Sequence, residues 1–240
     1  FKLHDFGSRG ASSEESAALG GMAHLVNFQG TDTVSAIVAA KHYYGADMAG
    51  FSIPAAEHST MTCWGKENEA KAYENMLDQF SKPGKLVAVV SDSYDLWNAI
   101  DNIWGDELKN KVESSGGTLV IRPDSGDPVS IVTETIERLM QKFGFSINAQ
   151  GYRTLPDCIR VIQGDGVDPR SIHQILANLN YEKIALDNIK YLTIQEVTIR
   201  ERVSLINNCH HINFHLLIDS FQDHLNYSLD HILFDFLFEQ

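Results

Sequence analysis

The feature that most constrains the fold is a repeated unit in which a short apolar segment ends in a polar turn and a helical pattern follows. The apolar segments of the three clearest units are Leu86–Val90, Thr118–Ile121 and Cys158–Ile162. The turn after each segment carries an aspartate, and these aspartates are Asp92, Asp124 and Asp165. An aspartate-proline pair, which is a strong helix-start signal, follows at Asp127-Pro128 and at Asp168-Pro169.

Repetition of strand, turn and helix predicts an α/β protein with a largely parallel sheet, either a barrel or a doubly wound sheet. The carboxyl ends of parallel strands meet at one pole, where α/β proteins collect catalytic groups. We therefore expect the three aspartates to lie together at a polar site. Spacing also predicts helices over 12–24, 34–44, 66–80, 94–104, 129–143 and 170–179, strands over 25–28 and 50–53, and a loop over 146–155.

Charge and cysteine content exclude several classes of function. The chain has 240 residues, a formal net charge of −13 and no run of lysine or arginine, so we expect neither nucleic acid nor membrane binding. Its three widely spaced cysteines favour a reducing, cytoplasmic setting over a disulfide framework. No apolar run reaches membrane-spanning length, and the chain opens on Phe1, so we expect it to begin inside a longer protein.

The turn Arg122-Pro123-Asp124 places a cation and a carboxylate directly after an apolar strand. Arg122 can grip a phosphate group with two parallel hydrogen bonds, and Asp124 can bind ribose hydroxyls or assist a metal ion. A structural turn with a surface ion pair explains the same residues equally well.

Three further positions have both a structural and a functional interpretation. His58 follows Glu57 in a polar loop, where it is either a hydrogen-bonded loop histidine or a reactive imidazole. Gly164-Asp165-Gly166 forms either a tight turn or a nest of backbone N–H groups for an anion. Phe6 either belongs to the core or offers its ring to an aromatic ligand.

Residues 190–240 differ in character, because they contain no glycine, alanine or proline and hold half of the ten histidines. His211 and His215 are spaced as neighbours on a helix, but no acidic or cysteine partner stands at ligand spacing, so we expect no metal site. Apolar residues at roughly helical spacing make a helical or a disordered tail the expectation. The segment is either an authentic terminus or translated non-coding sequence.

Six motifs, in order and in spacing, resemble those of the nicotinamide phosphoribosyltransferases in the type II phosphoribosyltransferase family. They read HDFGSRG, GTDT, PAAEHS, SDSYD, IRPDSG and VIQGDGVD, and they begin at His4, Gly30, Pro54, Ser91, Ile121 and Val161. The resemblance covers about residues 1–189 and implies an incomplete, irregular (β/α) barrel, with 190–240 as a divergent tail. It implies transfer of phosphoribosyl from 5-phosphoribosyl-1-diphosphate to nicotinamide in NAD salvage, giving nicotinamide mononucleotide and diphosphate. A homodimer, Mg²⁺ and coupled ATP hydrolysis are implied as well.

The resemblance also implies a role for each matching residue in binding nicotinamide and phosphate. Phe6 would stack on the nicotinamide ring, and Asp32 would accept a hydrogen bond from its carboxamide. Arg9 and Arg122 would hold phosphate groups, and Pro123 would bind substrate beside them.

Further roles concern the ribose and ATP. Asp124 would act at the catalytic centre by holding the ribose hydroxyls, and Gly164 and Asp165 would line the ribose-phosphate pocket. His58 would be the phosphorylated histidine, with Asp92 orienting its imidazole. The metal ligands are not identified by the motifs.

The chain departs from the family after Ile189, where members continue with a strand and a glycine-rich loop that binds the nucleotide phosphate, whereas this chain has Lys190-Tyr191-Leu192-Thr193. We therefore expect the chain alone to be inactive, with an open edge on its incomplete barrel. The alternative is a catalytically dead interaction protein that pairs with full-length subunits.

Overall fold

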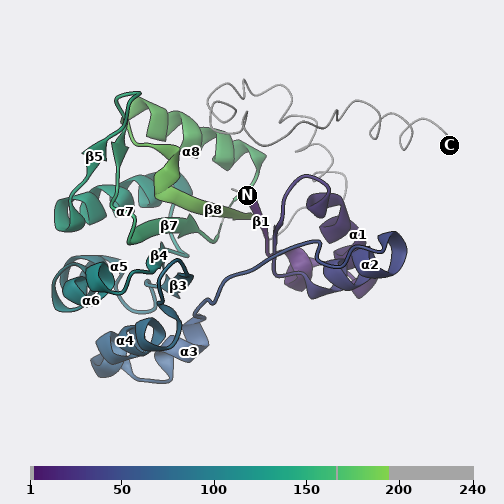
Figure 1. The fold of residues 1–240 in the computed structure, drawn as a ribbon, viewed down its shortest axis with the longest axis horizontal. Coiled ribbons are helices and arrows are strands. Elements are labelled where there is room, and N and C mark those ends of the chain that lie inside the picture. Colours follow the sequence, from purple (N-terminus) through teal and green to yellow (C-terminus); the bar gives the residue numbers. More distant parts are fainter. Residues whose placement is uncertain (1–2, 166, 195–240) are drawn as a thin grey trace. The chain divides into compact units, whose positions relative to one another are not determined.

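The three apolar segments of the repeated units are neighbouring strands in one parallel sheet of six strands (Figure 1). The computed structural model describes residues 3–165 and 167–194, which all belong to one unit. The strands are β1 (Leu3–Asp5), β2 (Gly30–Thr31), β3 (Leu86–Val90), β4 (Thr118–Arg122), β7 (Ile159–Gln163) and β8 (Ile189–Ile194). Their order in the sheet is β2-β1-β8-β7-β4-β3. The prediction of an α/β fold with an incomplete (β/α) barrel is confirmed, because this sheet is a curled half-barrel.

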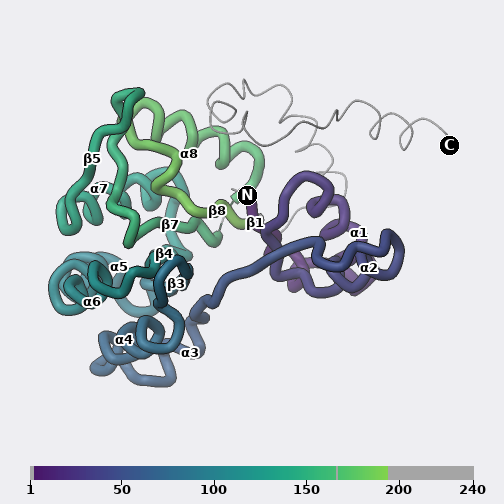
Figure 2. Tube along the Cα trace, in the orientation of Figure 1, coloured from purple at the N-terminus to yellow at the C-terminus, as the bar shows by residue number. Residues whose placement is uncertain are grey.

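A segment that includes residues 51–55 forms isolated β-bridges with both edge strands of the half-barrel, and its course can be followed in Figure 2. Phe51 pairs with Gly30 of β2, and Ala55 pairs with Ala88 of β3, both in parallel orientation. The Phe51 N–H donates to the carbonyl of Gln29 at 2.7 Å, and the Ala88 N–H donates to the carbonyl of Pro54 at 2.9 Å. The sheet is thus open between β2 and β3, as expected, and the two isolated bridges cover only part of each edge strand, at Gly30 and at Ala88.

Helices connect the strands and cover the sheet. They are α1 (Glu14–Leu25), α2 (Val34–Tyr44), α3 (His58–Thr62), α4 (Glu69–Phe80), α5 (Leu96–Asn98), α6 (Lys109–Ser114), α7 (Pro128–Phe143) and α8 (Pro169–Tyr181). Short 3₁₀ turns lie at η1 (Gly7–Gly10), η2 (Lys66–Asn68) and η4 (Leu186–Asn188), and the π-helix η3 (Ala99–Glu107) continues α5. None of the helices in the described ranges is both long and apolar enough to cross a membrane.

The helix ends follow from local sequence. Asp127 and Asp168 accept from the backbone N–H groups of Ser130 and Ser171, and each precedes a proline in the first turn. Both features fix the start of a helix, since proline needs no hydrogen bond there and the carboxylate satisfies a free N–H. Gly45 ends α2 in the left-handed conformation, with a φ of 66°.

Four local predictions differ from the structure. The segment 25–28 is the end of α1 and a turn rather than a strand, and 50–53 makes one isolated bridge at Phe51. The helix predicted over 12–24 begins at Glu14 and is capped by Ser13, whose hydroxyl accepts from the Ser16 N–H. The segment 146–155 contains the antiparallel pair β5 (Ser146–Ile147) and β6 (Arg153–Thr154).

The strand β8 was not predicted from the sequence. It pairs with β1 through Leu3 and Leu192, and with β7 through Gln163 and the same leucine. The predicted start of the divergent segment at residue 190 therefore falls within a strand of the sheet. The helical or disordered tail and the two histidines at 211 and 215 lie outside the described residues.

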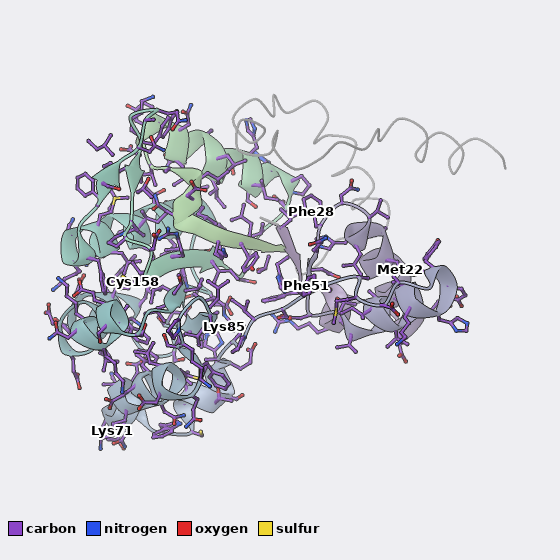
Figure 3. The ribbon with its side chains drawn as sticks, viewed as in Figure 1. Met22, Phe28, Phe51, Lys71, Lys85 and Cys158 are labelled. Carbon is purple, nitrogen blue, oxygen red and sulfur yellow. The ribbon has the colours of Figure 1, made fainter. Side chains whose placement is uncertain are left out.

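Apolar side chains from several strands meet under the polar pole. Ala88, Val120 and Ile162 form a buried cluster, against which Ile53, Leu86 and Tyr191 pack. Ile53 belongs to the segment that forms bridges with both edge strands, and Figure 3 labels Phe51 of the same segment. This cluster therefore joins β3, β4, β7 and β8 to the segment that contains Ile53.

Candidate active site

The predicted site residues follow the carboxyl ends of parallel strands. Phe6 follows β1, Asp32 follows β2, and Asp92 follows β3 by one residue. The turn Arg122-Pro123-Asp124 stands at the end of β4, and Gly164-Asp165 stands at the end of β7. Because all these strands run parallel, their carboxyl ends share one pole, as the sequence predicts.

His58 lies between two aspartates from neighbouring strands. Its Nε2 is 2.9 Å from Asp92 Oδ1, and its Nδ1 is 3.8 Å from Asp124 Oδ2. The second oxygen of Asp92 accepts from the backbone N–H of Asp124 at 2.9 Å and from the Ser125 hydroxyl at 2.7 Å. Asp92 thus holds the imidazole and the turn after β4 in one arrangement.

The hydrogen bond to Asp92 assigns the proton on the neutral His58 ring. An ionised carboxylate only accepts hydrogen bonds, so Nε2 carries the hydrogen that Asp92 receives. Nδ1 then has a free lone pair. The His58 side chain is 43% exposed, so a reactant from solvent can reach the ring.

Arg122 reaches the site from the buried end of β4. Its side chain is 3% exposed, and its guanidinium lies 3.3 Å from Glu57 Oε2 and 3.7 Å from Asp124 Oδ2. Burial raises the pKa of the Asp124 carboxyl, and Asp92 adds to the rise, while Arg122 and His58 oppose it. The site therefore combines a fixed cation with a carboxylate whose ionised form is partly disfavoured.

Gly164 is required by the carboxylate beside it. A Cβ at this position would lie 2.1 Å from Asp124 Oδ1, so no larger residue fits while Asp124 keeps its place. Within the described ranges, this buried Oδ1 has no hydrogen-bond partner. The Asp165 charge contributes to the raised pKa of Asp124, and its backbone carbonyl accepts from the Gln163 amide at 2.7 Å.

Phe6, Asp32 and Arg9 lie in the part of the pole around β1 and β2. Asp32 accepts from the Ser52 hydroxyl and lies 3.4 Å from His4 Nε2. Burial raises the pKa of Asp32, but contacts with His4 and Ser52 and the charge of Arg122 outweigh it and lower the pKa below 3.8. Asp32 is therefore a carboxylate at neutral pH and acts as a hydrogen-bond acceptor.

The remaining predicted residues differ in exposure. Arg9 is exposed on η1, and Pro123 is buried within the turn after β4. Phe6 is half-buried, and its ring contacts the His4 ring edge to face at 5.1 Å between centroids.

Sequence reasoning missed several residues that the fold brings to the site. His4, Ser52 and Ser125 contact predicted residues directly. Glu57 was noted beside His58, but its contact with Arg122 was not expected. The available signal was the position of His4 directly before Asp5-Phe6 in the first motif.

The fold and the site together define an α/β half-barrel whose polar pole presents a buried arginine, paired aspartates and a carboxylate-bound histidine. The model of the nicotinate phosphoribosyltransferase (NAPRTase) family matches residues 1–191, and the chain belongs to that family. The predicted resemblance to type II phosphoribosyltransferases is thereby confirmed.

Three curated relatives are described as nicotinamide phosphoribosyltransferases. The protein of Xanthomonas campestris pv. campestris is 55% identical over 191 residues, which are 80% of this chain and 41% of that protein. The protein of Acinetobacter baylyi is 33% identical over 207 residues, covering 78% of this chain and 41% of its own length. The protein of Mycoplasma pneumoniae is 35% identical over 204 residues, which cover 80% of this chain and 42% of that protein. This chain thus spans about two fifths of the length of the relatives it matches.

Proposed function

We propose that this chain carries the substrate-binding pole of a phosphoribosyltransferase that joins nicotinamide to 5-phosphoribosyl-1-diphosphate. The observation that carries the proposal is the pairing of two sites at one pole. Phe6 and Asp32 suit an aromatic carboxamide, and Arg122 with Asp124 suits a ribose phosphate. The name of the 55% identical relative supports the same reaction.

In this reaction the pyridine nitrogen of nicotinamide forms a bond to C1 of the ribose, while the bond from C1 to the diphosphate oxygen breaks. The electron pair of the broken bond leaves with diphosphate, and the pyridine nitrogen becomes cationic. Positive charge develops on the ribose in the transition state, so the nearby Asp124 carboxylate favours it, while Arg122 and Arg9 stabilise anionic phosphate groups.

Asp32 suits nicotinamide better than nicotinic acid. The carboxamide offers N–H donors to the ionised Asp32 carboxylate, whereas the carboxylate of nicotinic acid would be repelled. Phe6 and Asp32 both contact His4, so they lie in the same part of the site. The Phe6 ring would stack on the pyridine ring.

ATP coupling through His58 is part of the proposal. In the proposed tautomer Nδ1 attacks the terminal phosphorus of ATP, a P–N bond forms, and the P–O bond to ADP breaks. The positive charge that the ring acquires is favoured by Asp92 at Nε2.

Magnesium would assist by neutralising charge on the leaving diphosphate. The described residues contain no group of three or more histidine, cysteine or acidic side chains that could hold a metal ion. Asp124 Oδ1 is buried and free of hydrogen bonds within that range, which fits a magnesium ion held by one carboxylate and by substrate phosphates.

Residues 190–240 contain no glycine, so they do not supply the glycine-rich phosphate loop expected after the last family-like strand. We therefore propose that the 240-residue chain binds the substrates but does not catalyse the reaction by itself. We also propose that the protein forms a homodimer in the cytoplasm. Residues 190–240 are proposed to diverge from the sequence of the family.

Synthesis and binding assays on the purified chain test this function. Radiolabelled nicotinamide and 5-phosphoribosyl-1-diphosphate should each bind in equilibrium dialysis, and no nicotinamide mononucleotide should form from the pair. Absence of binding for both substrates contradicts the proposed site. Formation of the mononucleotide would contradict only the proposed inactivity.

The interaction-protein alternative is tested in the same experiment by adding a full-length relative. Exposed apolar side chains on α2, namely Val34, Val38, Tyr43 and Tyr44, favour an interface on this helix. Co-elution with the full-length subunit and an altered synthesis rate, without substrate binding by the chain itself, would favour the alternative.

A further inference from the structure

His4 is a buried polar residue at the point where the two nicotinamide-binding candidates meet. It lies in β1, is 3% exposed, and precedes Phe6 by two residues. Its ring contacts the Phe6 ring edge to face, with centroids 5.1 Å apart, and its Nε2 is 3.4 Å from Asp32 Oδ1. His4 is therefore in contact with both side chains at once.

The ring of His4 is held in place by packing rather than by hydrogen bonds to the fold. Tyr191 contacts it from β8 at 5.2 Å between centroids. A Cβ at residue 30 would lie 2.7 Å from His4 Nδ1, so the ring occupies space that exists because residue 30 is glycine. Among the described residues, neither ring nitrogen has a partner within hydrogen-bonding geometry.

A buried imidazole without a hydrogen bond lowers the stability of a fold, so its presence needs another explanation. The only acidic group that an ion-pair distance connects to His4 in the described ranges is Asp32. The contact of 3.4 Å is long for a hydrogen bond, and such contacts shorten when a ligand completes the site.

The contacts of Asp32 are divided unequally between its two oxygens. The Ser52 hydroxyl donates a hydrogen bond to Oδ1, and His4 Nε2 lies 3.4 Å from the same oxygen. Within the described part of the chain, Oδ2 accepts no hydrogen bond. The Asp32 side chain is 42% exposed, so Oδ2 is available to accept from a ligand carboxamide.

We propose that His4 is a positioning residue for nicotinamide recognition: its Nε2–H donates to Asp32 Oδ1 and, together with Ser52, presents Oδ2 to the carboxamide at a fixed distance from the Phe6 ring. The proposal rests on the proposed function, because it assigns Asp32 and Phe6 to nicotinamide. It explains why residue 4 is a histidine, which carries an N–H donor, although a phenylalanine ring would pack equally well in the same space.

The first test measures selectivity. His4→Phe keeps the ring size and removes the donor, and His173→Phe, at an exposed position on α8, is the matched control. The ratio of dissociation constants for nicotinic acid and nicotinamide, measured by calorimetry, should fall about tenfold in His4→Phe and remain unchanged in the control. An unchanged ratio in a His4→Phe chain that unfolds at the wild-type Tm would overturn the proposal.

The second test separates this proposal from the proposed function. Long-range ¹H–¹⁵N spectra of the wild-type chain report which nitrogen of His4 is protonated, without any ligand. We expect a protonated Nε2, an unprotonated Nδ1, and a shift of the Nε2 signal in Asp32→Asn. A proton on Nδ1, or spectra that Asp32→Asn leaves unchanged, would overturn the role of His4. Failure of the proposed function would appear separately, as wild-type chain that binds neither nicotinamide nor nicotinic acid.

Discussion

At the scale of residues, Asp92 uses its two carboxylate oxygens for different neighbours. One oxygen lies 2.9 Å from His58 Nε2, and the other accepts from the turn after β4. The imidazole orientation and the position of Asp124 therefore depend on the same side chain. Removing its charge should affect the chemistry of His58 before it affects the fold.

We predict that Asp92→Asn slows phosphorylation of His58 by ATP at least tenfold. The amide of the substituted side chain would donate to Nε2, so the ring would carry its hydrogen on Nδ1 and lose the nucleophilic lone pair there; the same exchange in a catalytic triad costs about 10⁴-fold. The measurement is acid-labile incorporation of label from γ-labelled ATP. His58→Gln should abolish the label, and His173→Gln should not. Equal labelling of Asp92→Asn and wild-type chain would refute the orientation role.

Asp32→Asn is expected to weaken selection for nicotinamide over nicotinic acid. The pKa of Asp32 lies below 3.8, so the native side chain is a carboxylate that repels the acid, whereas an amide can donate to it. Loss of one charge-assisted hydrogen bond, about 1.5–3 kcal/mol, corresponds to roughly tenfold or more in relative affinity. Competition binding with both ligands measures the ratio, and Asp47→Asn in an exposed loop is the control. Identical ratios in wild type and Asp32→Asn would exclude this contact.

Sequence reasoning named the candidate site residues that stand in motifs and missed the neighbours that only the fold brings near them. Asp92, Asp124 and Asp165 were predicted to gather because parallel strands share a pole, and the Asp92 and Asp165 charges both affect the pKa of Asp124. Ser52 lies twenty residues from Asp32, and its hydrogen bond depends on a segment with no regular strand pattern. No local signal distinguishes it from other loop serines.

At the scale of elements, the helix starts are encoded locally and were largely predictable. Asp168 caps α8 by accepting from the Ser171 N–H, and the Ser171 hydroxyl bonds back to the Asp168 backbone. The strand β8 and the π-helix η3 were not predicted, because both depend on distant partners. The carbonyl of Gln163 accepts from the Thr193 hydroxyl, and Trp104 in η3 donates to the Ser91 hydroxyl at 3.1 Å and stacks on Tyr73.

We predict that Asp168→Ala lowers the free energy of unfolding at pH 7 by about 0.5–2 kcal/mol, the usual value of a helix cap. Hydrogen bonds from the Ser171 backbone lower the pKa of Asp168 in the folded chain, so its contribution is present above about pH 3.8 and is lost as pH falls through the lowered value. Urea titrations of both chains should therefore differ more at pH 7 than at about pH 3. A difference that is constant or larger at the acidic pH would contradict the cap, and Asp47→Ala should show neither effect.

At the scale of the whole described unit, the segment around Phe51 and Ala55 joins β2 to β3 outside the six-stranded sheet. The sequence did not reveal this link, because the segment contains Pro54 and makes only two bridges. Its Ile53 side chain packs on the cluster under the site, so the link also supports the start of α3, where Glu57 and His58 lie.

Amide hydrogen exchange should detect this link. The N–H groups of Thr31, Phe51, Ala56 and Ala88 donate to carbonyls across the two bridges, so their exchange should be slowed relative to the exposed amide of Asp47. Exchange of Phe51 and Ala56 as fast as that of Asp47 would mean that the segment does not bond the sheet edges. The amides of β4, which lie between two strands, provide the internal reference for full protection.

The most direct test of the account is a calorimetric titration of nicotinamide mononucleotide into the 240-residue chain and into its Asp124→Asn variant. The account predicts saturable binding at one site per chain, weakened about tenfold or more by the variant, because the amide replaces a charged acceptor for the ribose hydroxyls. Asp124→Asn preserves the size of the side chain beside Gly164, so the fold should be retained. Absence of saturable binding by a folded wild-type chain, or equal affinity in the variant, would contradict a phosphoribosyl site at this pole.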